Sequence, residues 1–137
     1  MPLQAALAAA AADWTRAAVF DGAAVLAHVG YSAPPSHAEL APLLHTFDNR
    51  AETIAKGITL GSRHYEVHKW YGDHAPPLAY GREKAVKADG KVDEASEGIA
   101  VAKGAGGRFV VVCYALPVLS ALAVAQLRDF VRAEVMA

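Results

Sequence analysis

Histidine is the residue type in this chain with the most obvious capacity for chemistry, and His64 and His68 stand four apart in the segment HYEVH. Imidazole nitrogens are common zinc ligands. The HExxH pattern of zinc proteases, however, needs this spacing on a helix, with glutamate directly after the first histidine. Here tyrosine follows, and the segment alternates like a strand, where residues i and i+4 lie well apart. A metal site would also need a third ligand, for which Asp73 and His74 are nearest, so we expect partly exposed strand histidines and no metal.

Motifs for nucleophilic catalysis and phosphate binding are absent from the sequence: it has no G-x-S-x-G, no P-loop lysine and no G-x-G-x-x-G after a strand. The glycines of GAGGR (104–108) lie between two predicted strands, which favours a hairpin turn over a phosphate site at a helix N-terminus. Cys113 is the only cysteine and lies in the apolar run RFVVVCY. An intrachain disulfide and a four-thiolate zinc site are therefore excluded, and a buried thiol is expected. These features favour a binding module without a cofactor over an enzyme.

The bulk composition predicts one folded domain spanning 1–137. The chain is 54% hydrophobic and 20% charged, with a formal net charge of −1. That balance favours a packed core and gives no basic field for nucleic acid. No lysine or arginine precedes Arg16, and the apolar N-terminal run is too short to span a membrane, so we expect no signal peptide and a location in the reducing cytoplasm.

Periodicity and turn residues define the elements of the N-terminal half. Leu3, Leu7, Ala10 and Trp14 form one helical stripe. Next, the pair Asp21–Gly22 between two apolar segments predicts a β-hairpin. In the segment 32–48, Ser36 and Glu39 have the spacing of a capping box, which predicts a short second helix.

Strands dominate the chain after residue 57 until the last helix begins near Pro117. The segments 57–61, 63–71, 78–82, 98–103 and 108–114 have strand character, and the polar segment 83–97 predicts a solvated loop. In the last helix, Leu119, Ala123, Leu127, Phe130 and Val131 share one face. Strands joined by tight turns, with helices to cover them, predict an α+β domain built on an antiparallel sheet.

The joint spacing of several short segments resembles the profilin family over nearly the whole chain. GITLGSRHYEV (57–67) is similar to a signature strand ending in Leu-Gly-Gly, followed by a basic residue, a tyrosine and another strand. FDNRAETIAKG (47–57) and AELAPLLHTFD (38–48) precede it as in that family, and FDGAAVLAH (20–28) is similar to its Asp-Gly hairpin. Downstream, EGIAVAKGAGGRFVVVCY (97–114) and AQLRDFVRAEV (125–135) are similar to the last hairpin and the C-terminal helix.

The resemblance implies a central antiparallel sheet with the N- and C-terminal helices on one face and a short helix on the other. It also implies binding of monomeric actin in the cytoplasm and cytoskeleton, and so a role in actin polymerisation through sequestration of the monomer. Basic side chains suit this partner, because actin is acidic and charge complementarity speeds encounter. Carried over by position, the residues expected to contact actin are Arg63, Lys69, Arg82, Lys103, Ser120 and Ala121.

The same resemblance predicts a degenerate groove for proline-rich peptides. Profilins hold such peptides in an aromatic-lined groove, where flat rings stack on the polyproline helix. The matching positions here are Leu3, Leu26 and Phe130, while Trp14 matches none of them. Since aliphatic residues replace two of the three aromatic residues, we expect binding of proline-rich peptides to be weak or absent.

Other partners remain open at this stage. Small sheets flanked by helices also occur in roadblock- and longin-type modules, which dimerise or bind small GTPases. Apolar Val118 and Leu119, at the start of the last helix, could contact a partner other than actin. Phosphoinositide binding would require clustering of Arg82, Lys84, Lys87 and Lys91. We expect the protein to be a monomer.

Overall fold

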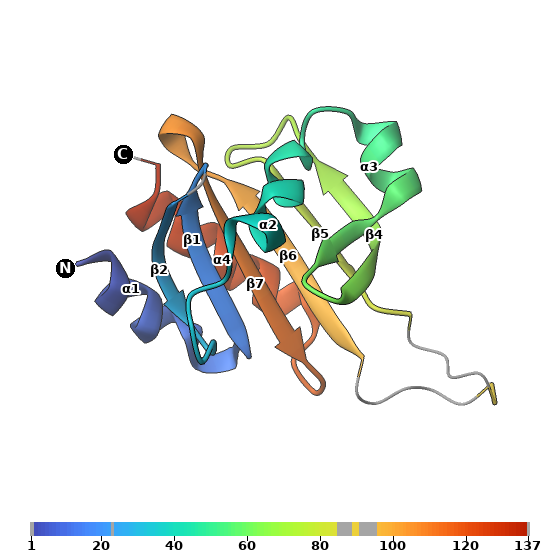
Figure 1. The fold of residues 1–137 in the computed structure, drawn as a ribbon, viewed down its shortest axis with the longest axis horizontal. Helices are drawn as coiled ribbons and strands as arrows, with labels where there is room; N and C mark the ends of the chain where they lie inside the picture. The colour runs from blue at the N-terminus through green and yellow to red at the C-terminus, as the bar shows by residue number, and fades with distance from the viewer. Residues whose placement is uncertain (1, 23, 85–88, 91–95, 137) are drawn as a thin grey trace.

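A computed structural model gives the fold and describes residues 2–22, 24–84, 89–90 and 96–136. Its centre is one seven-stranded antiparallel sheet in the order β2-β1-β7-β6-β5-β4-β3 (Figure 1). The strands are β1 (Arg16–Asp21), β2 (Ala24–Val29), β3 (Ile58–Leu60), β4 (Arg63–Tyr71), β5 (Leu78–Arg82), β6 (Glu97–Lys103) and β7 (Arg108–Ala115). The predicted hairpin turns therefore connect neighbours in a single sheet.

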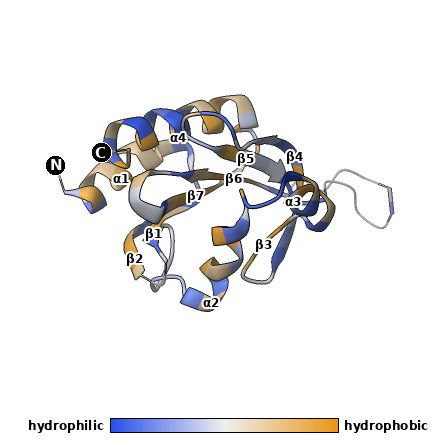
Figure 2. Ribbon diagram, turned by 90° about the horizontal axis from the view of Figure 1, so that it is seen from above, coloured by the Kyte–Doolittle hydropathy of each residue, from blue (hydrophilic) through white to orange (hydrophobic). Residues whose placement is uncertain are grey.

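Helices cover both faces of this sheet. The terminal helices α1 (Leu3–Ala10) and α4 (Ser120–Glu134) lie side by side on one face, with the 3-10 turn η1 (Ala11–Asp13) after α1 (Figure 2). The short helix α2 (His37–Leu40) and the 3-10 turn η2 (Ala41–His45) lie on the other face, and α3 (Arg50–Lys56) packs beside β4. This arrangement confirms the predicted α+β architecture.

Local sequence signals account for two of these elements. The turn between β1 and β2 carries Asp21 and Gly22, and Gly22 adopts a φ of 53°, a conformation that favours glycine. Ser36 caps α2, because its hydroxyl accepts a hydrogen bond from the backbone N–H of Glu39 at 3.2 Å. Both predictions from turn and cap chemistry are confirmed.

Helix α3 was not predicted. The sequence analysis placed no element between the second helix and the strand that begins near residue 57, and the structure has this helix there. The side chain of Asn49 accepts the backbone N–H of Glu52 at 2.9 Å, and Lys56 pairs with Glu52 one turn later at 2.6 Å. Gly57 ends the helix with a φ of 73°. The cap, the i,i+4 pair and the terminal glycine are all sequence signals of a helix, but the helix is only 7 residues long and has no apolar stripe.

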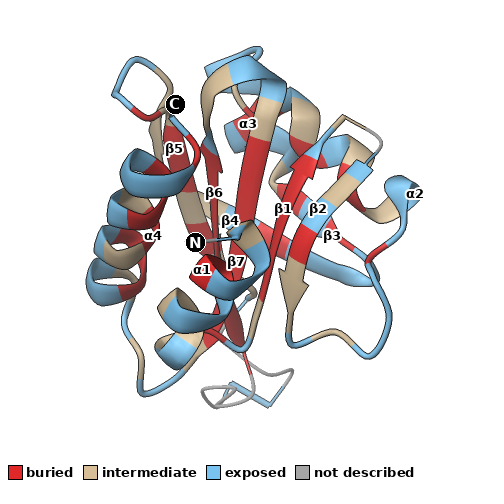
Figure 3. Cartoon of the chain, turned by 90° about the vertical axis from the view of Figure 1, so that its left-hand side faces the viewer, coloured by how far each residue is buried: buried red, intermediate tan, exposed pale blue. Residues whose placement is uncertain are grey.

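Two hydrophobic clusters fill the space between the layers, one on each face of the sheet. Figure 3 shows that the buried residues are concentrated in the central strands. In β7, Val110 and Val112 point toward α1 and α4, while Val111 and Cys113 point toward α2 and η2. This alternation follows from the two-residue period of a strand, and it explains why the run RFVVVCY is apolar throughout.

Two expectations about burial are wrong. Leu119 does not continue the buried stripe of α4, because it is the N-cap residue and its side chain is 62% exposed. Ser96 and Glu97, at the end of the predicted solvated loop 83–97, are buried, and Glu97 begins β6. The strand starts one residue earlier than predicted because Glu97 pairs with Ala115 of β7, and its carboxylate accepts a hydrogen bond from Tyr65 inside the domain.

Candidate functional site

Four of the six predicted contact residues surround the start of α4. Lys69 on β4 pairs in register with Tyr80 on β5, so both side chains share the face that carries α4, and Tyr80 lines a cavity together with Ala121. Arg82 lies over the ring of Tyr114 at 5.6 Å, and the hydroxyl of Tyr114 is hydrogen-bonded to that of Ser120 at 2.7 Å. Ser120 and its neighbour Ala121 open α4. We call Lys69, Arg82, Ser120 and Ala121 the β4–α4 surface.

The two basic side chains of this surface, Lys69 and Arg82, differ in exposure and in their internal partners. Arg82 is half-buried and donates a hydrogen bond from Nη1 to the carbonyl of Ser96 at 3.2 Å. Lys69 is exposed and makes no ion pair with any residue of the described ranges. A partner can therefore engage Lys69 without breaking an ion pair that the structure describes, whereas Arg82 is held by the carbonyl of Ser96.

Arg63 lies on the opposite face of the sheet from the β4–α4 surface. Its Nη1 donates to Oε1 of Glu83 at 2.8 Å and lies 3.7 Å from Oε2 of Glu97. The side chain lines a cavity together with Arg16 and Glu39, which faces α2. We expected Arg63 to lie with the other residues that contact actin. Strand alternation instead places its side chain on the opposite face of the sheet.

Lys103 is also remote from the β4–α4 surface. It pairs in register with Phe109, and its ammonium lies 5.8 Å from the centre of that ring, on the α2 side of the sheet. The following hairpin is tied to the far end of α4, since the N–H of Ala105 donates to the carbonyl of Val135 at 2.9 Å. A helix of 15 residues, about 22 Å long, separates that end from Ser120.

A polar network stabilises the α2 side of the sheet. Glu97 accepts hydrogen bonds from Arg16 and from the hydroxyl of Tyr65, the latter at 2.7 Å. Burial alone would raise the pKa of Glu97, but these hydrogen bonds and the charges of Arg16 and Arg63 outweigh burial and leave the pKa below its ordinary value. Burial raises the pKa of the Cys113 thiol beside them to about 12. Because its groups satisfy one another, we interpret this network as structural.

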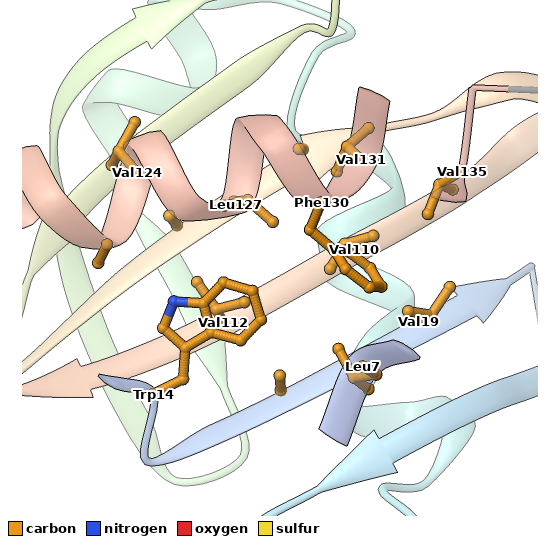
Figure 4. Close-up of a cluster of buried hydrophobic side chains, with 14 of the residues drawn as sticks. Leu7, Trp14, Val19, Val110, Val112, Val124, Leu127, Phe130, Val131 and Val135 are labelled. Carbon is orange, nitrogen blue, oxygen red and sulfur yellow. The ribbon is translucent and has the colours of Figure 1, made fainter. Parts of the chain in front are cut away.

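The space between α1 and α4 is filled by core side chains (Figure 4). Trp14 and Phe130 meet edge-on with ring centroids 6.2 Å apart, and both are only 6% exposed. Nε2 of Gln126 on α4 donates to Oδ2 of Asp13 at 2.7 Å, which ties α4 to the turn η1 that follows α1. Trp14, which matched no groove position in the sequence, is therefore the residue that closes this region.

The three predicted groove positions do not form one open lining. Leu3 is half-buried against the core, and Phe130 is buried under Trp14. Leu26 is the extra residue of a β-bulge, because Val19 pairs with Ala27 and Phe20 pairs with Val25. The bulge leaves Leu26 43% exposed on an outer strand.

Large apolar side chains are exposed where β7 leads into α4. Leu116, Leu119 and Leu122 are 43%, 62% and 50% exposed, whereas Val118 packs against the core. We call these three the leucine patch. Several exposed aliphatic side chains in one short segment are typical of a contact surface.

The remaining sequence candidates are the histidines and the basic residues considered for phosphoinositide binding. His64 lies 3.2 Å from the hydroxyl of Thr59 through Nδ1, and no group of three or more potential metal ligands occurs in the part of the chain that the structure describes. For the phosphoinositide cluster, Lys84 is exposed, while Lys87 and Lys91 lie outside the described residues. Among the described helices, none is both long and apolar enough to cross a membrane.

Comparisons with known proteins identify the fold. No protein-family model and no curated protein matches the sequence. Among solved structures, a Schizosaccharomyces pombe profilin matches with a TM-score of 0.73 at 20% identity, covering 96% of this chain and 94% of its own. Human profilin II matches with a TM-score of 0.68 at 16% identity, covering 96% of this chain and 99% of its own. Mouse profilin IIa, in complex with a double repeat from the FH1 domain of mDia1, matches with a TM-score of 0.67 at 15% identity over 89% of this chain and 86% of its own. The chain has the profilin fold.

Proposed function

We propose that this protein binds monomeric actin through the β4–α4 surface and thereby regulates actin polymerisation. The observation that carries the proposal is the gathering of Lys69, Arg82, Ser120 and Ala121 around the start of α4 in a chain with the profilin fold. Lys69 supplies an exposed positive charge for an acidic partner, and charge complementarity of this kind fixes register and accelerates encounter. Arg63 and Lys103 are left out of this surface, because they lie on the other face.

The packing of Trp14 against Phe130 supports a second part of the proposal: the α1–α4 region does not hold proline-rich peptides tightly. A polyproline helix needs exposed ring faces on which to stack. Here the two rings meet edge-on inside the core, and Leu3 and Leu26 offer no ring. The protein acts as a monomeric binding protein of the cytoplasm and cytoskeleton, not as an enzyme.

The leucine patch favours an alternative of a different class. Leu116, Leu119 and Leu122 give the start of α4 an apolar character, which suits a protein partner other than actin, such as a small GTPase or a second copy of this chain. Self-association would appear as a concentration-dependent mass in analytical ultracentrifugation. A constant mass equal to that of the monomer would exclude self-association through the leucine patch.

Calorimetric titration of the purified protein into monomeric actin tests the main proposal. We expect saturable binding of one protein per actin with a dissociation constant in the micromolar range, about −8 kcal/mol. A titration with no heat of binding, together with unchanged actin polymerisation kinetics, would contradict the proposal and favour the alternative. Melting curves of the same preparation show whether the protein is folded.

A further inference from the structure

The outer edge of β2 is the longer of the two open edges of the sheet. The strand order begins at β2 and ends at β3. Strand β3 has only 3 residues, and very short edge strands resist pairing with another chain. Strand β2 has 6 residues, Ala24–Val29, and the sequence places neither a charged residue nor a proline among them. Charges and prolines are common means of protecting an edge, so the protection of β2 must come from elsewhere.

Two different features protect the two halves of this edge. In the first half, the β-bulge at Leu26 interrupts the regular pairing of the strand. In the second half, helix α1 lies beside β2 (Figure 1), and its residue Gln4 reaches the edge. Nε2 of Gln4 donates a hydrogen bond to the carbonyl of His28 at 2.8 Å, and Oε1 of Gln4 accepts one from the N–H of His28 at 3.0 Å.

The two bonds at His28 are those that a neighbouring strand would make. In an antiparallel pair, a residue of one strand exchanges both an N–H and a carbonyl bond with the residue opposite. His28 lies opposite Ala18 of β1, but its N–H and its carbonyl are both bonded to Gln4. A primary amide offers a donor and an acceptor side by side, as the backbone does. Gln4 therefore occupies the place of a paired residue on a further strand.

The turn of α1 that carries Gln4 lacks the usual stabilisers of a helix start. Its N-cap residue is Pro2, whose side chain has no group that could cap the helix, and the sequence places no acidic residue in the first turn. Helix starts without such groups open readily. The buried residues of α1, Ala6 and Leu7, come only after this turn. Opening of the first turn withdraws Gln4 and leaves the N–H and carbonyl of His28 free to pair.

We propose that the outer edge of β2 is a self-association surface that Gln4 blocks: when the amide of Gln4 leaves, β2 of a second copy adds to the sheet as an antiparallel strand. Two identical edges related by a two-fold axis satisfy each other's backbone groups. Because β2 carries no charge, the pair sets no like charges opposite each other. A second copy also brings a strand that is already folded, whereas a free peptide must be ordered on binding. The inference does not depend on actin binding, since β2 and β4 lie toward opposite ends of the strand order.

Sedimentation equilibrium of the variant Gln4→Ala tests the proposal. Gln4 is exposed and alanine favours a helix, so the variant should keep α1 and the wild-type melting temperature. We expect its mass to rise with concentration toward twice that of the monomer, with a dimer dissociation constant about tenfold or more below that of the wild type. The matched control is Gln126→Ala, which removes a glutamine between α4 and η1 without opening a strand edge and should sediment like the wild type. A mass of Gln4→Ala that equals the wild-type mass at every concentration would overturn the proposal.

A second substitution locates the contact. Leu26 is 43% exposed on β2, so Leu26→Lys added to Gln4→Ala sets a positive charge on the edge of both copies and should restore the monomer. Leu122→Ala added to Gln4→Ala changes the leucine patch instead and should leave the dimer intact. Hydrogen exchange of the His28 amide is an independent readout: in dilute Gln4→Ala it should be faster than in the wild type, and it should slow again where the dimer forms. A dimer that survives Leu26→Lys would place the contact elsewhere and overturn the proposal.

Discussion

Trp14 and Phe130 pack edge-on between the first and last helices, with ring planes at 89° and centroids 6.2 Å apart. The two residues are 116 positions apart in the sequence (130 − 14), and their contact joins the N-terminal segment to the C-terminal helix. Aromatic side chains at this place belong to the core, and they are not available as a peptide-binding wall.

Truncation of Trp14 should therefore destabilise the fold. We expect Trp14→Ala to lower the free energy of unfolding by about 3–5 kcal/mol, since it empties a large buried volume between α1, α4 and the sheet. Chemical denaturation gives the value. Leu122→Ala, at a position that is 50% exposed, is the matched control and should change stability by less than about 0.5 kcal/mol. A similar small effect of Trp14→Ala would contradict the packing described here.

Gly61 should resist substitution because of its backbone conformation and not because of its surroundings. Its φ is 61°, and an added Cβ would meet only Oε2 of Glu39, at 3.6 Å. A β-branched residue strains this conformation, so we expect Gly61→Val to cost about 1–2 kcal/mol or more. Gly61→Asn should cost less, since asparagine tolerates left-handed geometry. Equal melting temperatures for the wild type and Gly61→Val would refute this reading of the turn.

Glu97 should make stability depend on pH in the acidic range. The folded-state pKa of its carboxyl lies below the ordinary value of 4.5, because hydrogen bonds from Tyr65 and Arg16 outweigh the opposing effect of burial. The resulting stabilisation is fully present above the unfolded pKa and is lost as pH falls through the folded pKa. Glu97→Gln should lower the free energy of unfolding at neutral pH by about 1–3 kcal/mol.

The difference between the wild type and Glu97→Gln should then shrink as the pH falls below 4.5. Urea denaturation at a series of pH values measures it. Glu52→Gln is the matched control, because a hydrogen bond from Lys56 also lowers the pKa of Glu52 but its carboxylate is exposed, and its effect at neutral pH should be smaller. A difference that stays constant with pH would show that the carboxylate charge of Glu97 contributes nothing.

Cys113 should be unreactive in the folded protein. Burial raises the pKa of its thiol to about 12, so almost no thiolate is present at neutral pH, and the side chain is 1% exposed. We expect alkylation by iodoacetamide at about pH 8 to proceed only as fast as the protein opens. Rapid alkylation under native conditions, at the rate seen in denaturant, would contradict the burial of this thiol.

Turn and cap chemistry was the part of the fold that the sequence predicted well. Gly22 and Ser36 act within a few residues of their own position, so local pattern is enough to assign their roles. The segments of strand character between tight turns likewise predicted the sheet. Helix α3 was missed because its sequence signals are polar. The helix is short and packs against β4 without an apolar stripe that would reveal it.

The six residues carried over by position do not all lie on one face, because a strand's sequence does not say which face of the sheet each side chain joins. Lys69 and Arg82 share the α4 face, whereas strand alternation before the bulge between Val67 and Lys69 places Arg63 on the other face, where it pairs with Glu83 and Glu97. Lys103 lies beside the hairpin that is bonded to the C-terminal end of α4, far from Ser120 at the start of that helix. Pairing register decides these placements, and register depends on residues far away in the chain.

The central claim, that the β4–α4 surface contacts actin, is tested most directly by a matched pair of charge reversals. Lys69→Glu and Lys103→Glu change the same charge on exposed lysines of two strands on opposite faces, so both should keep the wild-type melting temperature. Association rates with monomeric actin are measured by stopped flow. We predict that Lys69→Glu slows association about fivefold or more and that Lys103→Glu leaves it unchanged. Equal rates for the two variants, or a slower rate for Lys103→Glu alone, would contradict the account.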